Sequence, residues 1–241
     1  MRLLLAAVFC AAVAAAPPPA ETVARGFGVA VAYDPADFTA YAFSQEPKLA
    51  QRDVGTDIPE GVAPGRTVLH LTPAAARGSA GNRIEVTPLT DPSERDFAAA
   101  YPGLHSAARA LRALLRSRGI PSRKALQTAD PALVDSEYSF AARVERVSGP
   151  AVSGFAFLAQ FTQEADPAPP NNRELTYAFL GITADGRYLV EANLTVNHPS
   201  LAAQNLRDGM RQLARLDEGS FRPPLPRLKA MLRSLRVSGP R

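Results

Sequence analysis

Residues 174–196 read ELTYAFLGITADGRYLVEANLTV, and this stretch holds the strongest structural signal in the chain. Two runs rich in β-branched and aromatic residues, Glu174 to Thr183 and Arg187 to Val196, flank the short segment Ala184-Asp185-Gly186. Asp-Gly between two such runs is typical of a β-hairpin, because glycine readily takes the positive φ that a tight hairpin turn needs. The stretch therefore predicts two neighbouring antiparallel strands.

Two further strands are expected immediately before this hairpin. The runs from Ser136 to Val147 and from Ser153 to Thr162 alternate between two sets of side chains, as strands do. In the first run the alternation predicts that Tyr138 and Phe140 share a buried face, with polar residues on a wet face. The second half of the chain thus predicts a meander of four strands.

Shorter strands are expected in the first half of the chain. Phe27 to Tyr33 alternates in the same way and ends at the turn residues Asp34-Pro35. Thr67 to Thr72 and Arg83 to Thr87 are two more candidates. The intervening stretch from Ser44 to Arg66 contains several proline and glycine residues without lasting periodicity, which indicates a long connection.

Helical periodicity occurs in three places. Ser93 to Gly119 predicts two helical pieces that are broken at Pro102-Gly103. A second helix is expected after His198, with Asn197 or Ser200 as its cap. A terminal amphipathic helix is expected from Pro224 to Leu235. Runs of strands with helices before and after them predict an α+β fold, a mainly antiparallel sheet of about six or seven strands with helices packed on it.

The first 20 residues have the pattern of a cleavable secretory leader. Arg2 precedes an uncharged run from Leu3 to Ala16 and a proline triplet, and this run is too short to span a membrane. We therefore predict a signal peptide at residues 1–20 and a single exported domain at residues 21–241, periplasmic or extracellular, without an integral membrane span. The proline-rich stretch Asp166 to Asn172 is short and lies inside the strand meander, so one domain is favoured over two.

The composition excludes several classes of site. Cys10, the only cysteine, lies in the predicted leader, so the mature domain has no thiol for a disulfide, a thiolate zinc site or a cysteine nucleophile. The formal net charge is +4, with 27 basic and 23 acidic residues interspersed along the chain. A nucleic-acid-binding surface needs a concentrated basic stripe, so we expect no nucleic-acid partner.

Part of the chain resembles a family of exported bacterial proteins of unknown function. The resemblance extends more weakly to the region from Lys48 to Pro73, and it implies export but no activity. The residues that carry it are 154–158 (GFAFL), 160–163 (QFTQ), 170–172 (PNN), 175–188 (LTYAFLGITADGRY) and 196–201 (VNHPSL).

The order of the elements carries a second resemblance. An antiparallel sheet with a closing hairpin and a final helix that ends in Met231 to Val237 is similar to the PsbP/Mog1-type α/β/α sandwich. That resemblance implies a binding or assembly module, although fold alone does not determine function.

The sequence offers little support for catalysis. His70, His105 and His198 have no spacing that would direct two rings at one metal, and no Gly-x-Ser-x-Gly elbow or phosphate-binding loop occurs. Carboxylates such as Asp185 and Glu191 give no sign of converging at acid–base distance. We expect no metal and no cofactor.

The most suggestive polar cluster lies where the ends of the hairpin meet. If the chain turns at Asp185-Gly186, the loop before the third strand lies beside the end of the fourth strand. This places six candidate ligand-binding residues on one rim of the sheet, while side-chain turns at the loop and a helix cap at its partner are the structural alternative. The six residues are Asn171, Asn172, Arg173, Tyr177, Asn197 and His198.

These observations favour a non-enzymatic exported module that binds a small molecule or another envelope protein. Two other functions stay open. One is a hydrolase of unfamiliar type that uses His198 or His70 with a carboxylate. The other is a peripheral membrane protein that uses the basic terminal helix.

Overall fold

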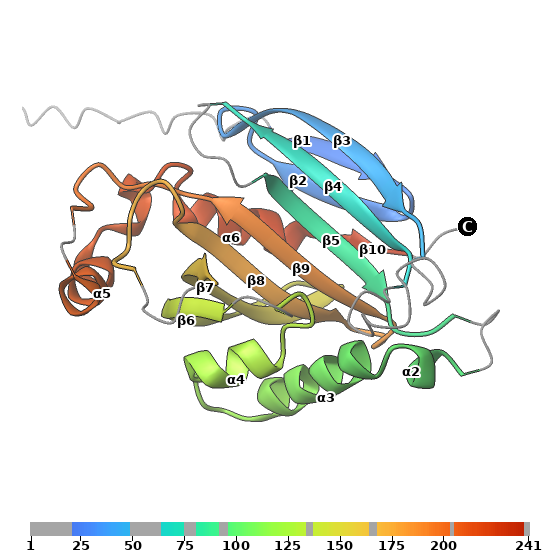
Figure 1. The fold of residues 1–241 in the computed structure, drawn as a ribbon. Helices are drawn as coiled ribbons and strands as arrows, with labels where there is room; N and C mark the ends of the chain where they lie inside the picture. Colours follow the sequence, from blue (N-terminus) through green and yellow to red (C-terminus); the bar gives the residue numbers. More distant parts are fainter. Residues whose placement is uncertain are drawn as a thin grey trace, which may run out of the picture.

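The computed structural model describes residues 21–48, 64–74, 81–91, 96–133, 137–163, 168–202 and 205–238 (Figure 1). The predicted signal peptide at residues 1–20 lies outside these ranges, as does most of the expected connection between Ser44 and Arg66. No helix within the described ranges has the length and hydropathy to cross a bilayer.

A seven-stranded antiparallel sheet forms the centre of the molecule and confirms the predicted α+β fold. Its strand order is β3-β4-β5-β9-β8-β7-β6, so the pairing of β5 with β9 joins the early strands to the later meander. The strands are β3 (Phe38–Glu46), β4 (Arg66–Pro73), β5 (Asn82–Pro88), β6 (Glu137–Ser148), β7 (Val152–Thr162), β8 (Thr176–Thr183) and β9 (Tyr188–Thr195).

The predicted hairpin is present between β8 and β9. Ile182 pairs with Leu189 across the turn, and Gly186 has a φ of 71°. The Asp185 carboxylate accepts hydrogen bonds from the Thr183 hydroxyl at 2.6 Å and from the Arg187 backbone N–H at 3.0 Å. The turn is therefore held by its own side chains as well as by the glycine.

The first strand prediction is wrong in its boundaries. Phe27 does not begin a strand, because Phe27 and Gly28 both have positive φ (45° and 76°) and form the turn between two short strands. These are β1 (Thr22–Gly26) and β2 (Val29–Tyr33), which form a separate three-stranded sheet with β10 (Arg236–Val237). The stretch expected to be a connection from Ser44 onward also begins inside β3.

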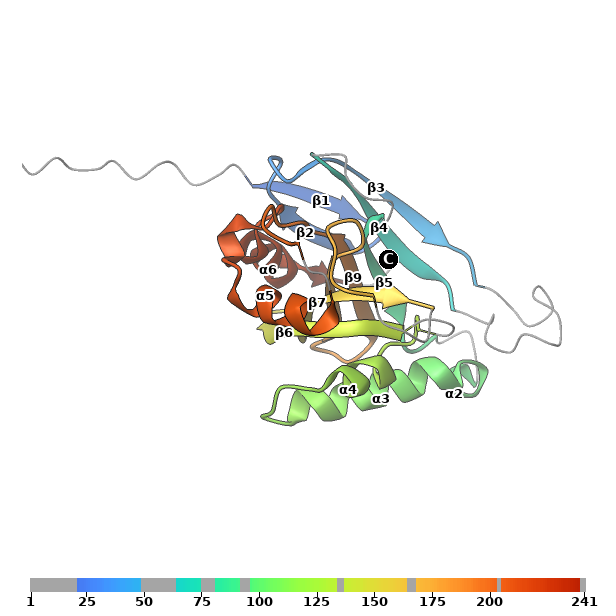
Figure 2. The same cartoon turned by 60° about the vertical axis from the view of Figure 1, so that its left-hand side comes forward.

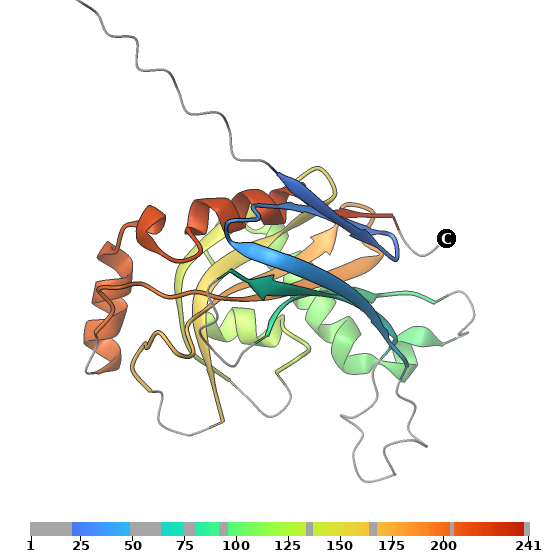
Figure 3. The same ribbon diagram turned by 90° about the horizontal axis from the view of Figure 1, so that it is seen from above.

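Helices cover both faces of the large sheet, as Figure 2 shows. One layer consists of α2 (Phe97–Ala100), α3 (Pro102–Arg116) and α4 (Arg123–Thr128). The other consists of α5 (Leu206–Arg215), the 3-10 turn η2 (Glu218–Ser220) and α6 (Leu225–Ser234), and it shares its face with the three-stranded sheet (Figure 3).

Of two predictions about the helices, one is confirmed and the other is wrong. The predicted break between two helical pieces at Pro102-Gly103 is confirmed, since α3 begins at Pro102. The predicted caps Asn197 and Ser200 are wrong, because α5 begins later and is capped by Asn205, whose side chain accepts a hydrogen bond from the Asp208 N–H. Asn197 instead forms an antiparallel bridge with Arg222.

The two faces of the sheet support two separate hydrophobic cores. The first core lies under α5, α6 and the small sheet, and the second lies under α2, α3 and α4. The predicted shared face of Tyr138 and Phe140 is wrong, because a register shift between them directs Phe140 into the first core and Tyr138 into the second. On the face of β6 that was expected to be wet, Ser139 is buried and Arg143 and Glu145 are partly buried.

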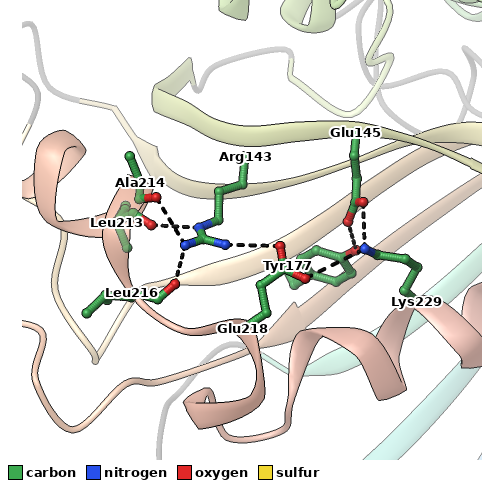
Figure 4. A network of polar contacts seen from close by, with 8 residues as sticks. All are labelled: Arg143, Glu145, Tyr177, Leu213, Ala214, Leu216, Glu218 and Lys229. Carbon is green, nitrogen blue, oxygen red and sulfur yellow. Dashed lines mark hydrogen bonds and ion pairs between the residues drawn. The ribbon is translucent and has the colours of Figure 1, made fainter.

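Two arginines of β6 fasten the ends of helices in opposite layers. Arg143 donates to the backbone carbonyls of Leu213 (2.6 Å), Ala214 and Leu216 at the end of α5, and it pairs with Glu218 at 3.0 Å (Figure 4). Arg146 donates to carbonyls at the end of α3. The last carbonyls of a helix lack partners within the helix, so these contacts satisfy otherwise open acceptors.

Replacing Arg143 tests this role. We expect Arg143→Met to lower the free energy of unfolding by about 3 kcal/mol, because three carbonyls and the Glu218 carboxylate lose a charged donor. Urea unfolding measures the change. The exposed Arg211→Met is the control and is expected to change stability by less than about 0.5 kcal/mol. Equal losses in the two variants would show that Arg143 does not fasten α5.

Candidate functional site

The hairpin brings the predicted amide-rich loop and His198 side by side. The Asn172 side chain bonds the His198 backbone twice: Nδ2 donates to the carbonyl at 2.9 Å, and Oδ1 accepts from the N–H at 2.8 Å. The Asn171 carboxamide oxygen accepts from the N–H groups of Arg173 and Glu174, which is a side-chain turn. Both amides therefore hold the rim together, and Arg173 is left exposed.

Tyr177 points away from this rim into the first core. Its hydroxyl donates to Glu145 at 3.0 Å, and Glu145 in turn pairs with Lys229 at 2.6 Å (Figure 4). Burial, followed by the nearby Glu145 charge, raises the pKa of Tyr177. Tyr177 thus joins β8 to β6 and α6 in a polar network under the helices.

His198 is buried at the rim beneath Phe221. Its ring lies edge-on to Phe221 with centroids 4.8 Å apart, Nδ1 accepts from the Ser200 N–H, and Nε2 has no partner. Burial lowers the pKa of His198. His70 contacts only the Ser44 hydroxyl at 3.1 Å. Within the described ranges, neither ring has a hydrogen bond to a carboxyl group.

A larger polar site lies on the opposite side of the sheet, and sequence reasoning missed it. It is a cleft of about 750 Å³ between the start of α3, the loop that follows α4, and the faces of β4, β5 and β9. This volume is in the range of small-molecule sites. We call it the α3 cleft. Its lining residues include Arg66, Arg83, Tyr101, Leu104, Asp130 and Glu191.

Strand alternation makes the floor of the α3 cleft polar. Ile84 and Val86 of β5 face the first core, so Arg83 and Glu85 face the cleft side. The same alternation on β9 directs Glu191 to that side, and Glu85 and Glu191 are direct cross-strand partners. Like charges directly opposite each other are unfavourable, so the floor must neutralise them.

Asp130 and Glu191 form a hydrogen-bonded carboxyl pair at the inner end of the cleft. Asp130 also accepts from the Tyr138 hydroxyl and, at 2.9 Å, from the Ala132 N–H. Burial, and after it the charges of Asp130 and Glu85, raises the pKa of Glu191 well above its usual range. Burial also raises the pKa of Asp130. A proton held between the two groups keeps them from repelling one another.

Glu85 is neutralised by two arginines instead. Arg66 Nη1 lies 2.7 Å from one Glu85 oxygen, and Arg83 Nε lies 2.7 Å from the other. Arg66 Nε also pairs with Glu46 at 2.6 Å. The side chains of Arg66 and Arg83 are 31% and 45% exposed, so these two ion-paired guanidinium groups remain partly accessible beside the cleft.

Tyr101 supplies the clearest sign that the α3 cleft is unfinished without a ligand. It is 3% exposed and lines the cleft, yet its hydroxyl has no hydrogen-bond partner among the residues that the structure describes. A buried hydroxyl without a partner costs about 1–3 kcal/mol. Tyr101 also precedes α3, whose first turn has no side-chain cap and no acidic residue.

The carboxyl pair had only a weak signal in the sequence. Glu191 is the single charged residue in the apolar run from Tyr188 to Leu194, which marks it as unusual. Asp130 lies in a short loop after α4, a helix that periodicity did not reveal. Among the described residues, no group of three or more acidic or histidine side chains has the geometry to hold a metal ion.

The comparisons with known proteins find no relative. No family model matches the chain, and neither the curated proteins nor the solved structures contain a match. The resemblances to exported bacterial proteins and to the PsbP/Mog1-type sandwich therefore stay predictions.

The protonated state of the carboxyl pair gives a test by stability. The folded state binds more protons than the unfolded chain once the pH exceeds the ordinary glutamate pKa of about 4.3, so stability falls as the pH rises from there to the raised folded value. Glu191→Gln removes this term. We expect the variant to gain stability relative to wild type with rising pH, by at most about 1.4 kcal/mol per pH unit.

Urea unfolding at several pH values between about 4 and 8 measures this difference. Glu137→Gln on the exposed start of β6 is the matched control and is expected to show no such trend. A difference between Glu191→Gln and wild type that does not change with pH would mean that Glu191 is ionised in the fold.

Proposed function

We propose that this protein is an exported, non-enzymatic binding module whose small-molecule ligand occupies the α3 cleft. The observation that carries the proposal is the buried Tyr101 hydroxyl, which has no partner within the described protein and belongs to a residue that lines the same cleft as Arg66 and Arg83. A ligand with hydrogen-bonding groups would satisfy all three side chains.

The energetics of the cleft floor support a functional role. Glu85, Asp130 and Glu191 are 3%, 8% and 7% exposed, so the fold removes three carboxyl groups from water. Apolar residues of similar size often stabilise a fold as well as a buried ionic cluster does. Retaining the charged cluster beside an open cleft is better explained by binding than by stability.

The site favours binding over catalysis. Asp130 already accepts hydrogen bonds from Tyr138 and Ala132 and is hydrogen-bonded to Glu191, so it is poorly placed to activate a water molecule. The histidine-based hydrolase that the sequence left open needs an imidazole paired with an acid, and the contacts of His70 and His198 within the described ranges do not provide one.

The membrane-binding alternative loses its main support. The apolar stripe of α6, formed by Leu225, Leu228, Met231 and Leu232, is buried in the first core. Those side chains are not available for insertion into a bilayer while the domain is folded.

The cleft is also favoured over the predicted rim as the ligand site. At the rim, the amides of Asn171 and Asn172 bond to the protein itself, and Tyr177 is tied to Glu145. Export of the module is supported by the leader-like pattern of residues 1–20 and by the absence of cysteine after Cys10.

Tyr101→Phe is the sharpest variant for testing the proposal. A thermal-shift screen of organic acids, sugars, amines and nucleotides against wild type is expected to give at least one compound that raises the Tm. The same compound should stabilise Tyr101→Phe less, by about 1–2 kcal/mol in binding free energy, because one hydrogen bond is lost. The substitution removes no contact within the described protein, so the unliganded variant should be at least as stable as wild type.

Tyr41→Phe, on the exposed face of β3 away from the cleft, is the matched control and should bind like wild type. Compounds that stabilise wild type and Tyr101→Phe equally would place the ligand elsewhere. Turnover of a generic ester, phosphate or peptide substrate would count against a non-enzymatic function.

A further inference from the structure

The lining of the α3 cleft combines hydrogen-bond donors with apolar side chains. Arg66, Arg83 and Tyr101 bring polar hydrogens to the lining. Its apolar side chains, which we call the apolar wall, include Leu104 and Leu133 together with alanine and proline residues. A ligand that fills this space needs a polar head group and an apolar body.

The open hydrogen-bonding groups of the cleft are mainly donors. Glu85 is already paired with both arginines, and Asp130 already contacts Tyr138, Ala132 and Glu191. The guanidinium groups of Arg66 and Arg83 can only donate. The head group must therefore accept hydrogen bonds, and a planar carboxylate matches the geometry of a guanidinium.

The start of α3 adds to the preference for an anion. Pro102, Gly103 and Leu104 form the first turn of this 15-residue helix, and all three line the cleft. Pro102 has no N–H, but the N–H groups of Gly103 and Leu104 in this first turn lack partners within the helix, and the helix dipole is positive at that end. No side chain caps this turn and no acidic residue lies in it, so within the described chain its positive end is left for a ligand.

We propose that the ligand of the α3 cleft is an organic carboxylate with an apolar body, bound through Arg66, Arg83, the Tyr101 hydroxyl and the start of α3. This inference rests on the proposed binding function and specifies its ligand class. An inorganic anion would use the donors but leave the apolar wall uncovered.

A matched set of ligands tests the chemical class. Isothermal titration calorimetry compares phenylbutanoate with its neutral amide, with the corresponding amine, with acetate and with inorganic phosphate. We expect phenylbutanoate to bind at least about tenfold more tightly than each of the others. We also expect Arg83→Met to weaken it about tenfold and Tyr101→Phe about fivefold. Tyr101→Phe keeps the test valid if Arg83→Met does not fold.

The other outcomes separate this inference from the proposed function. Binding of the amide or the amine as tightly as the acid, with the same loss in Tyr101→Phe, would overturn the carboxylate class and leave the binding module standing. Phosphate binding as tightly as phenylbutanoate would show that the apolar wall plays no part. If neither this set nor the broader screen binds in the cleft, both proposals are wrong.

Discussion

The pairing of β5 with β9 is the constraint on which the rest of the molecule depends. It joins the β3–β5 half of the sheet to the later meander, so it makes one continuous seven-stranded sheet from segments far apart in the chain. The same register sets Glu85 directly opposite Glu191. The sheet cannot have this connection without two carboxyl groups facing each other, and the ion pairs of Glu85 and the shared proton of Glu191 are the means by which that repulsion is relieved.

The position of the α3 cleft follows from the uneven cover of the sheet. The second core contains residues of β6, β7, β8 and β9 but lies mainly under α3 and α4, so the polar faces of β4 and β5 extend beyond it. A site at the border between a helix layer and an uncovered part of a sheet combines rigid strands with a helix start. That combination holds charged side chains in fixed positions with little loss of entropy when a ligand arrives.

The features that were predictable from sequence are those with a local cause. The Asp185-Gly186 turn, the meander and the terminal helix each depend on neighbouring residues, and all three are present. The turn at Phe27-Gly28 was missed because Phe27 takes a positive φ that its residue type disfavours. The carboxyl pair could not be predicted for another reason. Asp130 and Glu191 meet only because α4 packs on the sheet that contains β9, and periodicity in the sequence does not reveal such a contact.

The irregular strand β6 has a consequence for behaviour at high concentration. It is the last strand of the sheet, and an uninterrupted edge of this kind offers open backbone groups to a second molecule. Two register shifts interrupt its ladder, and Arg143, with a φ of 53°, turns its side chain to the end of α5. These irregularities make β6 a poor template for strand addition, so the same arginine that holds a helix in place also protects this edge of the sheet from edge-to-edge aggregation.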